Sequence, residues 1–179
     1  MIRTNSLSKT FKSRTGTTEA VKDVFVTFPP GLSVLIGGNG SGKSTLIRLL
    51  CTIEKPTRGG FSVDGTEIAG RALVNYRRRI GYVPQDVRFA STMTCRDALA
   101  YAGWVAGLDR RAYLRRIPEV LEMIELPEIE NSRVSNLSGG QTRRVGIAAS
   151  LIHSPDILFL DEPTAGLDPQ ARIEVRHLL

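Results

Sequence analysis

Gly37-Gly38-Asn39-Gly40-Ser41-Gly42-Lys43-Ser44-Thr45 is the stretch of this sequence that decides the fold. It fits the pattern G-x-x-x-x-G-K-[ST] and lies between an apolar run at residues 32–36 and a helix-like apolar pattern at residues 46–50. A strand, a glycine-rich loop and a helix in this order form a cradle of backbone N–H groups, and the helix adds the positive end of its dipole. The stretch therefore predicts a phosphate loop, residues 37–45.

Two side chains of the predicted phosphate loop have specific roles. Lys43 has an ammonium group that reaches the β- and γ-phosphates of a nucleotide, and Ser44 has a hydroxyl group that ligates Mg²⁺. A chance match of a glycine-rich turn is the alternative, and the flanking strand and helix patterns argue against it. The other positions predicted to hold phosphate are Gly37, Gly38, Asn39, Gly40, Ser41, Gly42 and Thr45.

Length and composition limit the remaining possibilities. A chain of 179 residues with 41% hydrophobic residues suits one globular domain. No stretch approaches the roughly 18 unbroken apolar residues of a membrane span, and the first residues lack the apolar core of a signal peptide, so we expect a cytosolic protein. Cys51 and Cys95 are expected to be buried small hydrophobic residues rather than a disulfide or metal ligands.

The formal charge of +6 leaves three interpretations open. The basic residues form short clusters without interleaved aromatic residues, so solvated helix faces explain them most simply. Attraction to an anionic membrane face is the second interpretation, and nucleic-acid binding, which we do not expect, is the third. The clusters are Arg77-Arg78-Arg79, Arg110-Arg111, Arg115-Arg116 and Arg143-Arg144.

The N-terminal segment predicts two strands, residues 2–11 and 21–28, around a polar loop at residues 12–19. Phe11 could stack on an adenine ring, with Val21 as an apolar wall, although a core position for Phe11 fits equally well. After the phosphate loop, Asp64-Gly65 predicts a hairpin turn, and residues 71–79 predict a helix.

The middle of the chain predicts one short strand followed by helices. Residues 80–83 form the strand, which Pro84-Gln85 closes. Thr94 is expected to cap a helix that runs through Trp104, and Asp109 to cap another that Pro118 interrupts or restarts. Residues 137–141 then lead into a helix at residues 142–152, whose N-terminus offers a second anion-binding site.

The last third of the chain contains two carboxylates at the end of a strand. Residues 157–160 are a continuous apolar run, typical of a fully buried parallel strand, and Asp161-Glu162 follow directly. A Mg²⁺ ion shared with Ser44 would satisfy Asp161, while Glu162 would orient or deprotonate an attacking water. A helix cap or a surface loop is the alternative for these carboxylates. Further on, Asp168 is expected to cap a closing helix.

Together these motifs resemble the nucleotide-binding domain of an ATP-binding cassette (ABC) protein. The resemblance implies an α/β, P-loop NTPase (RecA-like) fold: a mainly parallel core sheet flanked by helices, an N-terminal antiparallel β lobe, and an α-helical insertion that carries the signature motif. The resemblance implies a single domain over residues 1–179. Residues 1–90 would form the β lobe and phosphate-loop core, residues 91–136 the helical part, and residues 137–179 the signature helix, the Walker B strand and the D-loop. The matching motifs are the phosphate loop, Gln85 of the Q-loop, the signature Leu137-Ser138-Gly139-Gly140-Gln141, the Walker B residues Asp161-Glu162, and the D-loop around Asp168.

The resemblance also implies cofactors and roles. ATP with Mg²⁺ would lie between the phosphate loop of one domain and the signature motif of a second, paired head to tail as a homo- or heterodimer. Glu162, Lys43 and Gln85 would be catalytic, and Ser44, Gln85 and Asp161 would surround Mg²⁺. The residues expected to contact the second domain or its nucleotide are Ser138, Gly139, Gly140, Gln141 and Asp168.

One family residue has no match in this sequence. In the family, a histidine of the switch loop follows the Walker B motif by about thirty residues and contacts the γ-phosphate. His177 lies only fifteen positions after Glu162 (177 − 162 = 15), and His153 lies beside a turn, so we give neither a catalytic role. We therefore expect an incomplete domain that binds nucleotide, hydrolyses it weakly or not at all, and exposes an apolar edge beside residues 157–160.

The favoured biological role is the motor subunit of an ABC transporter. It would act at the cytoplasmic face of the membrane with a separate permease, and its general appearance resembles cassettes that serve export permeases. A soluble ABC ATPase acting on nucleic acid or the ribosome is one alternative, although neither long heptads nor a second cassette is present. A non-hydrolysing remnant is the other.

Overall fold

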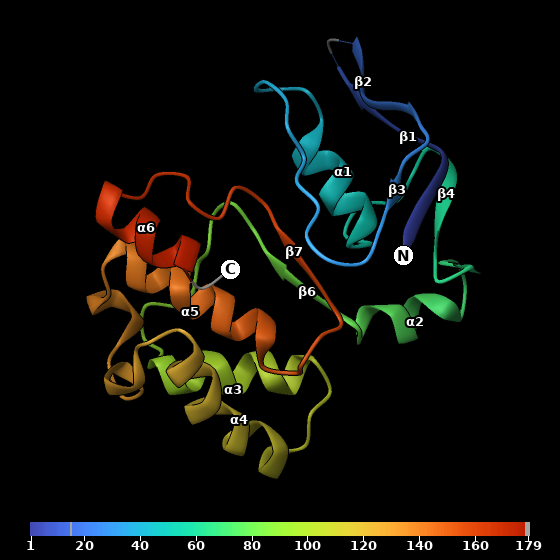
Figure 1. Ribbon diagram of the computed structural model, residues 1–179. Helices are drawn as coiled ribbons and strands as arrows, with labels where there is room; N and C mark the ends of the chain where they lie inside the picture. The colour runs from blue at the N-terminus through green and yellow to red at the C-terminus, as the bar shows by residue number, and fades with distance from the viewer. Residues whose placement is uncertain (15, 178–179) are drawn as a thin grey trace. The chain divides into compact units, whose positions relative to one another are not determined.

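The computed structural model describes residues 1–14 and 16–177. Its contacts divide the chain into two compact units, Met1–Arg77 and Arg78–Leu179. Figure 1 shows the course of the chain through both units. The boundary between the two units, at Arg77 and Arg78, lies within residues 1–90, which were predicted to form the β lobe and phosphate-loop core. The elements of the N-terminal unit are β1 (Ile2–Ser13), β2 (Gly16–Val24), β3 (Thr27–Phe28), α1 (Lys43–Leu50), β4 (Arg58–Val63), β5 (Thr66–Glu67) and α2 (Ala72–Arg77).

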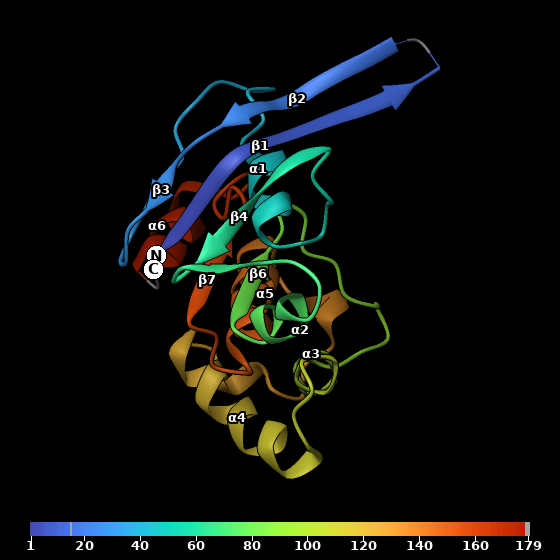
Figure 2. The same ribbon diagram turned by 90° about the vertical axis from the view of Figure 1, so that its right-hand side faces the viewer.

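The N-terminal unit contains the predicted antiparallel β lobe. Its strands are ordered β2-β1-β4-β5, and β3 pairs with β1. β1 and β2 form a long hairpin, clearly visible in Figure 2. The predicted polar loop at residues 12–19 is wrong for most of its length, because Lys12 pairs with Thr17 and Phe11 with Thr18. β-branched threonines favour the strand conformation even where no apolar alternation marks it.

Asp64 and Gly65 form the predicted tight turn between β4 and β5. Their φ angles are 50° and 81°, the positive pair that a two-residue hairpin loop requires.

In the same unit the Tyr76 hydroxyl donates to the Leu50 carbonyl at 2.9 Å, which joins the end of α1 to α2. The helix predicted at residues 71–79 is confirmed, although it is shorter and spans Ala72–Arg77.

The strand expected at residues 32–36 is absent from the structure. These residues have no regular secondary structure, and Leu32, Val34 and Ile36 are 87%, 70% and 93% exposed. A strand is stable only when a neighbouring strand pairs with its backbone, and no strand within residues 1–14 and 16–77 pairs with this segment. The apolar run alone was therefore not sufficient to predict a strand.

The C-terminal unit combines a short parallel sheet with a helical core. β6 and β7 pair in parallel, from Ile80 with Ile157 to Val83 with Leu160. β7 is half-buried rather than fully buried as expected, since β6 is its only partner among the described residues. The elements of this unit are β6 (Ile80–Val83), α3 (Cys95–Val105), α4 (Arg110–Met123), α5 (Gly139–Leu151), β7 (Ile157–Leu160) and α6 (Pro169–His177), with 3-10 turns at Pro127–Ile129 and Val134–Asn136.

The helices of the C-terminal unit begin at the predicted caps. The Thr94 hydroxyl accepts from the Asp97 N–H, and the Asp109 carboxylate accepts from the Ala112 N–H. The expected break at Pro118 is wrong, because α4 continues through it to Met123. Proline removes one helical hydrogen bond, but the flanking Ile117 is fully buried and packs in the core. Packing thus outweighs the lost hydrogen bond.

The core of the C-terminal unit is formed mainly by α3, α4 and α5. Leu99, Ile117, Leu121 and Ile147 are almost completely buried there. Cys95 belongs to the same cluster, and burial raises the pKa of its thiol, so the expected inert role agrees with the structure. None of the helices in the described part of the chain has the length and apolar character that a membrane span needs.

Candidate nucleotide-binding site

The phosphate loop enters α1 through Gly42, whose φ angle is 88°. A Cβ atom at this position would lie 2.2 Å from the Ala20 carbonyl oxygen, so only glycine fits. Lys43 begins the helix and bends back over the loop, where its Nζ donates to the Gly37 and Gly38 carbonyls at 2.8 and 2.9 Å. The ammonium group is thus held inside the loop that is expected to bind phosphate.

A cavity of about 440 Å³ lies beside the phosphate loop within the N-terminal unit. Val21 contributes an apolar wall, as predicted, and is 6% exposed. Phe11 does not line this cavity; the residue is 41% exposed, and the centre of its ring lies 4.9 Å from the Lys9 ammonium. Asn39 and Gly40 form a turn of the loop, while Ser44 and Thr45 lie in the first turn of α1.

Gly42→Ala is expected to destabilise the N-terminal unit. The substitution forces an alanine into a left-handed conformation and places Cβ against the Ala20 carbonyl, so we expect the free energy of unfolding to fall by about 2 kcal/mol or more. Gly38→Ala is the matched control, because its Cβ would meet nothing within 4 Å. Urea unfolding of both variants measures the difference, and equal losses would contradict this account of the loop.

Gln85 and Glu162 come together at one edge of the parallel sheet. Because Val83 and Leu160 are paired at the carboxyl ends of β6 and β7, the residues that follow them emerge side by side. The Gln85 Nε2 donates to Glu162 Oε2 at 3.0 Å. Glu162 has a φ angle of 47° and an exposed side chain. An exposed carboxylate held by an amide donor is suited to bind and orient a water molecule.

Asp161 differs from Glu162 in its surroundings. It is 1% exposed, and its N–H donates to the Val83 carbonyl at 3.0 Å, so the chain is fixed at this point. Carboxylate, amide and hydroxyl oxygens are suitable ligands for Mg²⁺, which usually completes its shell with water and nucleotide phosphates. The three residues predicted to bind Mg²⁺ belong to different units. Gln85 and Asp161 lie in the C-terminal unit, and Ser44 lies in the N-terminal unit.

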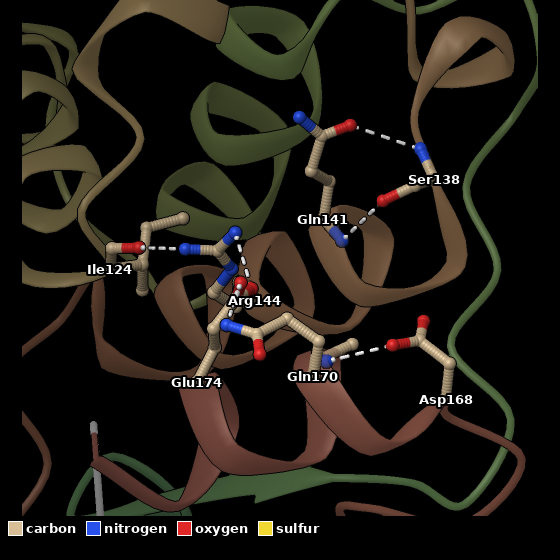
Figure 3. A network of polar contacts seen from close by, with 8 residues as sticks. Ile124, Ser138, Gln141, Arg144, Asp168, Gln170 and Glu174 are labelled. Carbon is tan, nitrogen blue, oxygen red and sulfur yellow. Dashed lines mark hydrogen bonds and ion pairs between the residues drawn. The ribbon is translucent and has the colours of Figure 1, made fainter.

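The signature motif forms the N-terminus of α5, as Figure 3 shows. The Ser138 hydroxyl accepts from the Gln141 N–H at 3.2 Å, and the Gln141 side chain accepts from the Ser138 N–H at 3.0 Å. The helix starts at Gly139, three residues earlier than predicted, because this reciprocal cap satisfies its first turn. The N–H groups of a capped helix end still favour a nearby anion.

Asp168 and α6 lie close to the signature helix. The Asp168 carboxylate accepts from the Ala171 N–H at 3.0 Å, so it caps α6 as predicted. A Cβ atom on Gly140 would lie 2.8 Å from the Ala171 Cβ, which shows how closely α5 and α6 approach. Arg144 adds an ion pair to Glu174 at 3.0 Å (Figure 3). His177 is exposed at the end of α6, and His153 contacts the Ile80 carbonyl at 3.0 Å.

Arg143 has contacts that the sequence did not predict, because its cluster was explained most simply as a solvated helix face. Arg143 is 5% exposed and donates to the Pro84 and Gln85 carbonyls, both at 2.6 Å. Burial lowers the pKa of its guanidinium, while the charges of Asp86 and Asp161 act in the opposite direction. Its burial could have been suspected from its position in α5, because residues on several sides of this helix are buried.

Comparison with protein families identifies the chain. A family model described as ABC transporter matches residues 21–165. The methionine import ATP-binding protein MetN 2 of Bacillus licheniformis is 39% identical, and its counterpart in Rhodopseudomonas palustris is 41% identical. Both alignments cover 100% of this chain, but only 54% and 48% of those relatives. The chain therefore spans about half the length of the curated relatives it matches.

Solved structures agree with this assignment. The ATP-binding cassette MJ0796, described as a dimer in a post-hydrolysis state bound to ADP and Pi, matches with a TM-score of 0.84 and 29% identity, over 99% of this chain and 81% of that one. The cbiO1 protein of Clostridium perfringens, part of the ABC transporter complex cbiONQ, matches with a TM-score of 0.81 and 31% identity, over 99% and 71% of the two chains. From its phosphate loop to its Walker B carboxylates, this chain belongs to the ABC transporter family.

Proposed function

We propose that this chain binds ATP at its phosphate loop and contributes to ATP hydrolysis as the motor subunit of an ABC transporter. The hydrogen bond between Gln85 and Glu162 carries this proposal, because an amide donor holds the carboxylate that we propose as the general base. Glu162 would take a proton from the attacking water, while Lys43 would stabilise the phosphate charge. Glycine at position 42 and the Lys43 contacts give the loop the shape that this role needs.

Mg²⁺ is the metal that we propose for the site. Ser44, Asp161 and Gln85 would hold it directly or through water, and bound Mg²⁺ would neutralise charge on the β- and γ-phosphates. The described residues contain no group of three or more histidine, cysteine or acidic side chains suited to a metal. A site that depends on nucleotide phosphates for several ligands needs no such group.

A second nucleotide-binding domain is the first partner in this proposal. The N-terminus of α5, with Ser138 to Gln141, would face the γ-phosphate of a nucleotide held by the other domain, and Asp168 would lie at the same interface. The description of MJ0796 as a dimer supports this arrangement. A cavity of about 300 Å³ between Gln85, Leu137 and Gly166 keeps this end of α5 accessible.

A membrane permease at the cytoplasmic face is the second partner. The MetN relatives are named as import proteins, so we propose import, in contrast to the export cassettes that the sequence suggested. The solute named for those relatives, methionine, is the first to test. The proposed role needs no membrane-spanning helix in this subunit, because the permease would provide the path.

The test is a titration of the purified chain with ATP and Mg²⁺, followed by measurement of phosphate release. We expect saturable ATP binding that strengthens when Mg²⁺ is added, since the metal neutralises phosphate charge. Analytical ultracentrifugation with ATP would then detect dimers through the signature motif. A chain that binds no ATP at millimolar concentration would refute the proposed function.

A further inference from the structure

Arg143 joins the signature helix to the Q-loop. It lies on α5 five residues after the cap residue Ser138, and its side chain enters the interior of the C-terminal unit. Each terminal nitrogen donates to a different carbonyl, Nη1 to Pro84 and Nη2 to Gln85. The planar guanidinium group gives each carbonyl its own donor nitrogen, whereas a lysine at this position would have to reach both carbonyls from one nitrogen.

The chain of contacts continues to the proposed general base. Arg143 fixes the backbone of Gln85, and the side chain of Gln85 donates to Glu162 at 3.0 Å. The two contacts therefore connect the signature helix to the carboxylate at the end of β7. Gly146 brings the same helix closer still, because a Cβ there would lie 2.8 Å from the methyl groups of Val87.

We propose that Arg143 is a positioning residue, which sets the place of Gln85 and thereby of Glu162 according to the position of the signature helix. The inference rests on the proposed function, since it assigns Glu162 the role of general base. If a second domain engages Ser138 at the start of α5, a shift of that helix moves the Q-loop backbone with it.

The neighbouring Arg144 provides a matched comparison. It points to another side of α5, where it pairs with Glu174 and donates to the Ile124 carbonyl at 3.3 Å (Figure 3). Neither contact involves the Q-loop. Two adjacent arginines in one helix therefore connect it to two different segments, and replacing each in turn separates a specific effect from general damage to α5.

The first measurement is amide hydrogen exchange of the full chain. Arg143→Met should raise exchange at residues 85–88 by about tenfold or more, because two hydrogen bonds to a charged group are lost. Arg144→Met should leave residues 85–88 unchanged and raise exchange at residues 170–177 instead. Arg143→Lys should restore part of the protection, and it tests the same contact if the methionine variant does not fold. Unchanged exchange at residues 85–88 in the Arg143 variants would overturn the proposal.

The second measurement separates positioning from nucleotide binding. ATP affinity should change less than about twofold in the Arg143 variants, because the phosphate loop belongs to the other unit. Under conditions in which the parent chain hydrolyses ATP, kcat of Arg143→Met should be lower by about tenfold or more, while KM stays constant. Arg143→Lys should restore part of the lost kcat. Equal kcat in parent and Arg143→Met would overturn the link to Glu162. A parent that binds no ATP would refute the proposed function, whereas the exchange result would still decide whether Arg143 holds the Q-loop.

Discussion

Lys43→Ala should weaken ATP binding by about 100-fold, the size expected when charged contacts to two phosphates are removed. The structure gives a second reason for a large effect. Lys43 donates to the Gly37 and Gly38 carbonyls, so its removal also takes away two contacts that shape the loop. Isothermal titration of ATP in the presence of Mg²⁺ measures the change directly.

Lys12→Ala is the control for this result. Lys12 is an exposed lysine of β1 in the same unit, and its replacement removes the same charge without touching the loop. We expect its ATP affinity to remain within about twofold of the parent, since long-range attraction is screened by salt. Equal weakening by both substitutions would show that net charge, rather than the loop, holds the nucleotide.

Glu162→Gln should preserve ATP binding and lower turnover by about 100-fold to 10,000-fold, the range attributed to a positioned general base. Glutamine keeps the shape of the side chain and an oxygen that can accept from Gln85 Nε2. It lacks the basic carboxylate that would take a proton from water. Phosphate release at saturating ATP is the measurement, with binding titrated in parallel.

Glu122→Gln provides the comparison for Glu162→Gln. Glu122 is an exposed residue of α4, so the same chemical change there should not affect turnover. A Glu162→Gln protein that hydrolyses ATP at the rate of the parent would exclude Glu162 as the base. Loss of binding together with turnover would instead indicate that Glu162 supports the nucleotide site structurally.

Local sequence signals predicted those parts of the fold that local physics determines. Thr94, Asp109 and Asp168 cap helices as expected, and Asp64-Gly65 turns the chain between β4 and β5. In each case a side chain satisfies a nearby backbone group, or a residue pair accepts positive φ angles. The partner lies within a few positions in the chain, and the pattern is therefore visible in the sequence.

Features that depend on distant partners were predicted less well. Residues 32–36 have the composition of a strand but no pairing strand in their unit, and Pro118 remains helical because the core holds α4 together. The contact between Gln85 and Glu162 joins residues 77 positions apart. Arg143 donates to carbonyls 59 and 58 positions away in the chain, so its burial could not be inferred from charge clustering.

The exposed apolar run at residues 32–36 has a consequence for solution experiments. Leu32, Val34 and Ile36 alternate along an uncharged, proline-free segment whose backbone groups no strand of the unit covers. Such a segment can pair with its counterpart in another molecule and promote self-association at high concentration. Self-association through residues 32–36 needs no ATP, whereas dimers assembled through the signature motif should require the nucleotide.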